Sequence, residues 1–244
     1  MSELKSYETV SSSPSHSATA GSQAGTAAAS EIMNKVFMWM TVGLALTGST
    51  ALWFASSPLI LQLTPMTMIV LFLVQLGLVF WLSARVMSMQ PTTAILVFLV
   101  YSALTGVTLA PIFLVYTSAS IGTTFLITAA TFGVMATYGI VTNQDLTKVG
   151  NIAFMALIGL IIASVVNWFL QSPVMHYIIS GIGVLVFTAL TAYDAQKIKE
   201  MSHQLQGESQ DVQTRASILG ALSLYLDFIN LFIMLLQFFG ARRD

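Results

Sequence analysis

The stretch Ala216-Ser-Ile-Leu-Gly-Ala-Leu-Ser-Leu-Tyr-Leu-Asp-Phe-Ile-Asn-Leu-Phe-Ile-Met-Leu-Leu-Gln-Phe-Phe239 decides the fold. It is almost continuously apolar, and Asp227 is its only charged side chain. As an α-helix rising about 1.5 Å per residue, it is long enough to cross about 30 Å of hydrocarbon. A carboxylate in hydrocarbon is costly, so such a residue tends to mark a pathway, a relay or a switch.

Six similar segments precede this one along the chain. We place them at 32–55, 59–84, 92–116, 119–141, 149–171 and 174–196. Pro111 should kink the third segment, because proline removes a backbone donor from the helix. The sequence therefore predicts an all-α integral membrane protein, a bundle of seven transmembrane helices with the lipid bilayer as its surroundings.

The composition supports a membrane protein and excludes several other classes. Hydrophobic residues make up 56% of the chain and charged residues 8%, whereas a soluble domain carries about 25% charged residues. The net charge of -1 gives no electrostatic case for nucleic acid as a partner. The chain has no cysteine, which excludes disulfides, thiolate metal sites and cysteine nucleophiles. We expect no resident cofactor.

The first thirty or so residues differ from the rest. Residues 1–30 are rich in Ser, Ala, Gly and Thr and contain too few apolar side chains to offset the entropy of ordering. We expect a disordered cytoplasmic tail, followed by a transmembrane domain over 31–244. The tail is not a signal peptide, because no basic region precedes an apolar core within it.

Charge placement predicts the orientation in the membrane. Seven basic residues flank the first segment or lie in the even-numbered loops: Lys5, Lys35, Arg85, Lys148, Lys197, Lys199 and Arg215. The positive-inside rule then places the N-terminus and those loops in the cytoplasm. Arg242 and Arg243 conflict with this, since seven spans put them outside. The last segment either crosses nevertheless or dips in and returns, and we expect it to cross.

The last segment carries a polar stripe. Gly220, Ser223, Asp227 and Asn230 are three or four residues apart, so they share one helical face. We expect Ser223 and Asn230 to line a pore or cavity beside Asp227, because a polar stripe on an apolar helix points inward. The alternative is that Asp227 is a buried packing residue without further function.

A second aspartate, Asp194, lies near the end of the sixth segment. The simpler interpretation is a helix-end acid paired with a neighbouring lysine. If it meets Asp227, both carboxylates cannot ionise cheaply in a low dielectric, and the pair becomes a proton-controlled switch that also offers oxygen ligands to Ca²⁺. The predicted helix ends, however, offset the two by about 15 Å. Meeting requires the sixth segment to run past Asp194, or the seventh to enter the membrane after residue 216.

Two other polar features are functional candidates. Arg85 follows the second segment, either as an ordinary positive-inside flank or as a counter-ion that latches the aspartates. Asn167 shares a face of the fifth segment with Ser164 and Gln171. These three side chains line a wet cavity or form hydrogen bonds between helices, with equal expectation.

Several motifs together resemble the Bax inhibitor-1 family, the transmembrane Bax inhibitor motif proteins, in its bacterial inner-membrane branch. They are Tyr101-Ser-Ala-Leu-Thr-Gly-Val-Thr-Leu-Ala-Pro111-Ile, Thr131-Phe-Gly-Val-Met-Ala, Gly150-Asn-Ile-Ala-Phe-Met-Ala-Leu-Ile-Gly, Thr191-Ala-Tyr-Asp-Ala-Gln-Lys-Ile-Lys199 and Leu222-Ser-Leu-Tyr-Leu-Asp-Phe-Ile-Asn-Leu231. The resemblance implies a bundle with the last helix central and a Ca²⁺ leak gated by pH. It assigns the di-aspartyl sensor, with weak Ca²⁺ binding, to Asp194 and Asp227 and the latch to Arg85.

Two other functions were weighed against a channel. Some bacterial members of the family resemble regulators of an FtsH-type membrane protease, and a Ser-rich tail fits such an interaction protein. An intramembrane aspartyl protease would also use two aspartates on adjacent spans. Its second aspartate follows Gly-x-Gly, whereas Leu224-Tyr-Leu precedes Asp227. We therefore do not expect an enzyme.

Overall fold

The computed structural model describes the backbone of residues 15–243 and the side chains from residue 29 onward. This part of the chain is almost entirely helical, and its only β-pairing is one bridge between Tyr116 and Arg242. The α-helices (α) and short 3-10 helices (η) are α1 (Ser15–Ala55), η1 (Pro58–Gln62), α2 (Pro65–Arg85), η2 (Val86–Ser88), α3 (Pro91–Leu109), α4 (Ile112–Val115), α5 (Ser118–Val141), α6 (Thr147–Leu170), α7 (Pro173–Gln204) and α8 (Gln210–Phe239).

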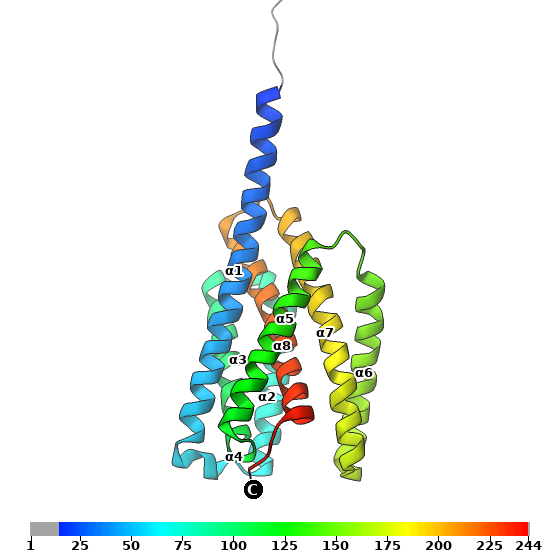
Figure 1. Ribbon diagram of the computed structural model, residues 1–244. Coiled ribbons are helices and arrows are strands. Elements are labelled where there is room, and N and C mark those ends of the chain that lie inside the picture. The colour runs from blue at the N-terminus through cyan, green and yellow to red at the C-terminus, as the bar shows by residue number, and fades with distance from the viewer. Residues whose placement is uncertain (1–14, 244) are drawn as a thin grey trace, which may run out of the picture.

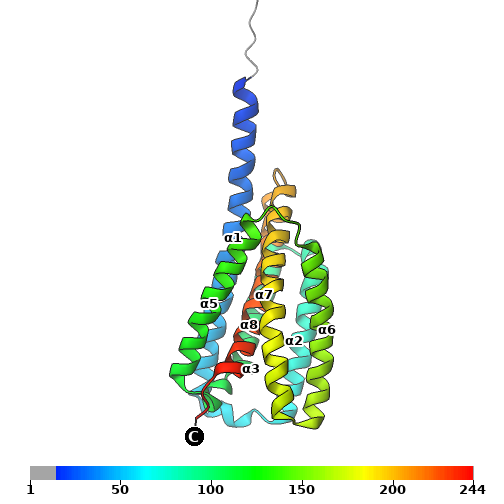
Figure 2. The same cartoon turned by 45° about the vertical axis from the view of Figure 1, so that its right-hand side comes forward.

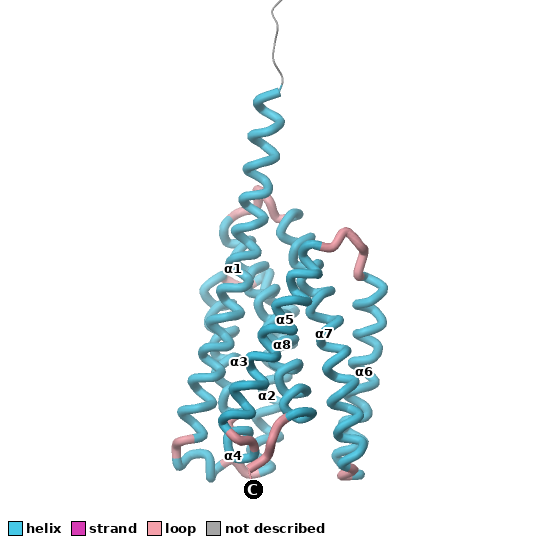
Figure 3. The backbone as a smooth tube through the Cα atoms, in the orientation of Figure 1, coloured by secondary structure: helices cyan, strands magenta, loops and turns pink. Residues whose placement is uncertain are grey.

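The helices form one bundle with short loops at its two ends (Figures 1 and 3). We name these ends the α7–α8 end, where α7 runs into α8, and the α4 end, which holds α4 and the C-terminus. Helix α8 lies in the middle and contacts α1, α3, α5 and α7. Helices α2 and α6 lie at the edge, where α2 packs mainly on α3 and α6 on α7 (Figure 2). The expectation of a central last helix is confirmed.

Within residues 15–243, seven helical segments are long and apolar enough to cross a membrane. They cover Ala29–Ala55, Pro65–Ser88, Pro91–Val115, Ser118–Val141, Thr147–Leu170, Pro173–Gln204 and Gln210–Phe239. Large apolar side chains such as Phe80, Leu126 and Phe169 are exposed on the outside of the bundle, as expected for a surface that faces lipid. The prediction of an all-α bundle of seven membrane-spanning helices is confirmed.

Two proline positions refine the predicted helix limits. The second span begins at Pro65 rather than at residue 59. Thr64 caps this helix, because its hydroxyl accepts a hydrogen bond from the backbone N–H of Thr67 at 3.2 Å. Pro111 breaks the third segment instead of only kinking it, since α3 ends at Leu109 and the short helix α4 follows.

The last two helices are longer than their apolar parts. Helix α7 continues to Gln204 rather than ending at 196, and α8 begins at Gln210 rather than at 216. Most of the added residues of α7 are polar, but five of the eight are Lys, Glu, Gln or Met, which favour helix. Asp194 therefore lies about three turns inside α7 rather than at its end. Helix α8 crosses the whole bundle, so the last segment is not re-entrant.

The structure also differs from the sequence prediction at the N-terminal side. Helix α1 begins at Ser15, so residues 15–30 are helical where a disordered tail was predicted. This stretch contains many alanines, and alanine has the strongest intrinsic preference for helix. Residues 1–14, the rest of the predicted tail, lie outside the described residues.

Candidate functional site

The two aspartates come from the antiparallel helices α7 and α8 and line one cavity of about 390 Å³. We name it the aspartate cavity; its polar lining consists of Asn151, Tyr193, Asp194, Lys197, Ser223, Asp227 and Asn230. The continuation of α7 past Asp194 is one of the two conditions under which the sequence allowed the acids to meet. The structure thus brings both carboxylates to one space inside the bundle.

The polar stripe of α8 forms one wall of this cavity. Ser223, Asp227 and Asn230 all line it, as their spacing of three and four residues requires for one helical face. Leu224 and Tyr225 lie between them in sequence and are fully buried against other helices. Because α8 is central, its remaining faces pack in the core while this stripe faces the cavity.

Neither carboxylate is satisfied by its surroundings. Asp227 is 5% exposed, and its buried Oδ2 atom has no hydrogen-bond partner among the described residues. Asp194 is half-buried. The only ion pair in the described part of the chain joins Lys35 and Glu31 of α1 and involves neither aspartate. A bare buried charge costs several kcal/mol, so each carboxylate needs a proton, a water molecule or a cation as its partner.

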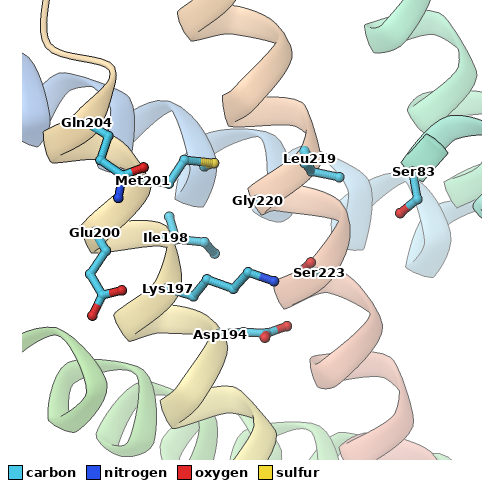
Figure 4. A pocket seen from close by; sticks show the side chains of 10 residues that line it. All are labelled: Ser83, Asp194, Lys197, Ile198, Glu200, Met201, Gln204, Leu219, Gly220 and Ser223. Carbon is cyan, nitrogen blue, oxygen red and sulfur yellow. The ribbon is translucent and has the colours of Figure 1, made fainter. Parts of the chain in front are cut away.

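A second cavity opens next to the first, at the α7–α8 end of the bundle. We name this space of about 580 Å³ the mouth cavity, and Figure 4 shows the ten residues that line it. Asp194, Lys197 and Ser223 line both cavities. In Figure 4 the Lys197 side chain extends across the mouth cavity toward Ser223, above Asp194. The cationic group is therefore on the same helical face as Asp194, although the two form no ion pair.

Close helix packing fixes the segment that carries Asp194. A Cβ atom added at Gly139 of α5 would clash with the backbone oxygen of Ala192. One added at Gly150 of α6 would lie 2.5 Å from the ring of Tyr193. Helices α5 and α6 therefore contact α7 at the two residues directly before Asp194. Only glycine permits this approach, which sets the position of the carboxylate.

The part of α7 beyond Asp194 holds the loop between α5 and α6. The side-chain oxygen of Gln196 accepts a hydrogen bond from the backbone N–H of Leu146 at 2.9 Å, and its amide nitrogen donates to the carbonyl of Gln144 at 2.8 Å. Lys199 Nζ donates to the carbonyl of Ile140 at 2.7 Å. These two polar residues fix the loop to α7, a role that the sequence analysis did not identify.

The same loop contains Asp145, an acid whose surroundings differ from those of Asp194 and Asp227. Asp145 is exposed, and its Oδ1 accepts a hydrogen bond from the backbone N–H of Thr147 at 2.8 Å, at the start of α6. Hydrogen bonds from the Thr147 side chain and backbone lower the pKa of Asp145. This carboxylate is consequently ionised at neutral pH and serves as a reference for the two in the cavity.

The predicted latch residue lies apart from both cavities. Arg85 is exposed at the end of α2, and Ser83 rather than Arg85 lines the mouth cavity. Another arginine ties this region to the central helix: Arg215 of α8 donates to the carbonyl of Met87 at 2.6 Å. The sequence analysis assigned Arg215 no role beyond its positive charge. The latch function of Arg85 stays a prediction.

Asn167 lines a different cavity from the aspartates. This space of about 500 Å³ lies at the α4 end, and Ser164, Gln171 and Arg242 also line it. Asn167 Oδ1 accepts a hydrogen bond from the backbone N–H of Ser172 at 3.1 Å, so it shapes the connection between α6 and α7. Of the three predicted lining residues, only Ser223 and Asn230 share a cavity with the aspartates.

The chemistry of the aspartate cavity suits passing contact with a hard cation. The described part of the chain contains no group of three or more His, Cys, Asp or Glu that could hold a metal ion. Two carboxylates with neutral oxygens from Ser223, Asn230 and Asn151 provide the ligand type that Ca²⁺ prefers. The number of carboxylates is too small for tight binding, so a cation there would exchange readily.

Comparison with known proteins agrees with this architecture. The sequence profile of the family described as "Inhibitor of apoptosis-promoting Bax1" matches residues 29–244. The inner membrane protein YbhL of Escherichia coli strain K12 is 48% identical over 214 residues, which cover 86% of this chain and 92% of the relative. An uncharacterized protein of Borreliella burgdorferi is 43% identical over 217 residues, covering 88% and 93% of the two chains. The chain is an integral membrane protein and belongs to the Bax inhibitor-1 family.

Proposed function

We propose that the protein is a pH-sensitive cation leak channel that conducts Ca²⁺, with Asp194 and Asp227 as its gate. One observation carries the proposal: both aspartates line a single polar cavity inside the bundle, and this cavity adjoins the mouth cavity at the α7–α8 end. In the interior of a membrane protein, unpaired carboxylates beside a polar cavity usually belong to an ion or proton path.

The gate works through the charge of the pair. When the two carboxylates share a proton, α7 and α8 stay together, because the repulsion between two like charges in a low dielectric is relieved. A change in protonation alters the repulsion between Asp194 and Asp227 and their attraction for Lys197. Helix α2 borders the mouth cavity through Ser83 and packs mainly on α3. Of the helices around this cavity, it packs least against its neighbours.

The positions of the basic residues support an orientation of the channel in the membrane. Basic residues gather at the α7–α8 end. Arg85 ends α2, Lys148 lies in the first turn of α6, Lys197 and Lys199 lie in the last turns of α7, and Lys35 donates to Gln210 at the start of α8, near Arg215. The positive-inside rule then supports a cytoplasmic N-terminus and a mouth cavity that opens to the cytoplasm. By similarity to the inner membrane protein of Escherichia coli, we propose a bacterial inner membrane as the location.

Ca²⁺ flux into liposomes from about pH 6 to 8 tests the proposal. We compare the wild-type protein with Asp194→Asn and Asp227→Asn, and use Asp145→Asn as the matched control because Asp145 lies in an exposed loop at the same end. The two cavity variants should lose or shift the pH dependence, since the pair can no longer change its charge. The control should follow the wild-type profile.

Two results would contradict the proposal. A flux that neither cavity variant alters would remove the aspartates as the gate. Absence of flux from well-folded protein would favour the alternative, an interaction protein that regulates an FtsH-type membrane protease. The extension of α1 beyond the bundle (Figure 1) supplies a surface for such a partner.

A further inference from the structure

A further polar cavity lies on the other side of the polar stripe of α8, between α2, α3 and α8. It has a volume of about 340 Å³, and five polar side chains from these three helices line it: Gln75, Tyr101, Thr105, Thr108 and Asn230. We name it the amide cavity after Gln75 and Asn230. Its lining contains no charged residue, which distinguishes it from the aspartate cavity.

Gln75 is the informative member of this group. It is the only polar residue of α2 between Thr67 and Ser83, and an amide in the interior of a membrane span is costly unless it is bonded. Its Nε2 donates to Thr105 Oγ1 at 3.0 Å, and that hydroxyl donates to the carbonyl of Tyr101 at 2.9 Å. The Gln75 side chain is therefore held against α3 and the cavity rather than facing lipid.

The two amides leave oxygen atoms free for a ligand. Asn230 Nδ2 donates to the carbonyl of Leu226 at 2.8 Å, while Asn230 Oδ1 accepts no hydrogen bond from any described residue. Gln75 Oε1 likewise has no donor within the described part of the chain. Both side chains line the amide cavity, and amide oxygens are neutral ligands of the type that hard cations accept.

Asn230 also connects this cavity to the aspartates. Both Asn230 and Leu226 line the aspartate cavity and the amide cavity. The amide cavity reaches Met68 in the first turn of α2, which lies toward the α4 end. The mouth, aspartate and amide cavities thus follow one another along α8 from one end of the bundle toward the other.

We infer that Gln75 and Asn230 form a second, uncharged cation site, which receives the ion after the aspartates. This inference rests on the proposed channel function and extends it to the second half of the path. A conducting pore must bind an ion well enough to admit it and weakly enough to release it. Neutral oxygens hold Ca²⁺ less tightly than carboxylates do, so the ion can leave the charged site without becoming trapped at the next one.

The liposome flux assay tests this site with substitutions that leave the gate intact. Gln75→Leu should lower Ca²⁺ flux on the order of tenfold at every pH, equivalent to about 1.4 kcal/mol, without moving the pH midpoint. Gln75→Glu should lower the Ca²⁺ concentration at which flux saturates, because a carboxylate holds the ion longer. Thr105→Val removes the hydroxyl that positions Gln75 and should reduce flux by a smaller factor.

The matched control is Thr137→Val, which removes a hydroxyl that bonds only to the backbone of its own helix and lies on the exposed surface. It should conduct like the wild type. Flux that is normal in Gln75→Leu would overturn this inference and leave the aspartate gate standing. A shifted pH midpoint in Gln75→Leu would also overturn it, because Gln75 would then belong to the gate. Absence of flux from the wild-type protein would overturn the channel function together with this site.

Discussion

Helices α8 and α2 are equally apolar but occupy opposite positions in the bundle. In the most apolar 18-residue stretch of each helix, the mean hydropathy is 2.0 for α8 and 2.2 for α2. Yet 61% of that stretch is buried in α8 and only 11% in α2. Hydropathy reports that a segment avoids water, and it does so equally for a lipid-facing and a protein-facing helix. The distinction between centre and periphery has to come from another property.

The polar residues supply that property. Helix α8 carries Ser217, Ser223, Asp227 and Asn230 within its span, whereas the middle of α2 has Gln75 alone. In lipid, each such side chain must find a partner in protein or in a polar cavity. A helix with many of them is therefore drawn to the centre, and a helix with one needs only one protein-facing side. For these two helices, the polar side chains within the span, rather than its hydropathy, agree with the observed place in the bundle.

Replacing an aromatic side chain with alanine should give the largest difference in stability between variants of α8 and variants of α2. Tyr225 of α8 is fully buried; its ring packs against Phe98 at 5.7 Å, and its hydroxyl lies 2.7 Å from Thr47 Oγ1. Tyr225→Ala should lower the free energy of unfolding by about 3–5 kcal/mol. Phe80→Ala on the exposed side of α2 should change it by less than about 0.5 kcal/mol.

Thermal unfolding in detergent, followed by tryptophan fluorescence, measures this difference. Tyr225→Phe serves as the control, since it keeps the ring and removes only the bond to Thr47. It should cost about 1 kcal/mol, the usual net value of one hydrogen bond. Equal losses in Tyr225→Ala and Phe80→Ala would show that the two helices do not differ in the way that their burial indicates.

The sequence predicted the fold because the membrane simplifies it. Long apolar stretches in a bilayer have few alternatives to spanning helices, because no water satisfies their backbone there, so all seven spans were found. The helix limits were less accurate. A hydropathy pattern gives the length of chain in hydrocarbon, whereas α7 continues to Gln204 through polar residues that favour helix. That extension brings Asp194 beside the aspartate cavity, and the pattern could not reveal it.

The sequence predicted only part of the candidate site, and the reason is related. Periodicity placed Ser223, Asp227 and Asn230 on one face of one helix, and the structure agrees. Which helix faces that stripe depends on packing between distant segments, such as Gly150 against Tyr193, and single-helix periodicity contains no such information. For this reason the sequence did not show where the Asn167 cavity lies relative to the aspartates, and the amide cavity on α2 was not foreseen.

A smaller effect should separate glycines on the two helices. A Cβ atom added at Gly220 of α8 would lie 3.1 Å from Val36 Cγ2, whereas nothing lies within 4 Å of one added at Gly77 of α2. Gly220→Leu should destabilise the protein by about 1–3 kcal/mol through overpacking. Gly77→Leu should be neutral or slightly stabilising, since leucine favours helix more than glycine does. The same melting experiment compares them, and a destabilised Gly77→Leu would mean that α2 is packed more closely than the structure indicates.

The smallest expected effect on stability concerns the carboxylate of Asp145. It compares an acid in an exposed loop with the two acids inside the bundle. Asp145 is fully exposed, and its pKa is lowered by the hydrogen bonds from Thr147. A lowered pKa in the folded state means that the ionised form stabilises the protein above the unfolded pKa of about 3.9, and that this stabilisation disappears as the pH falls through the lowered value.

Asp145→Asn should therefore unfold at a slightly lower temperature than the wild type at pH 7. The difference between them should disappear once the pH falls below the lowered pKa of Asp145, where the wild-type carboxyl is protonated as well. Because nothing in this titration lies between pH 6 and 8, the exposed acid leaves the gating range unchanged. A difference in melting temperature that grew between pH 6 and 8 would assign part of the pH response to the periphery of the bundle and away from Asp194 and Asp227.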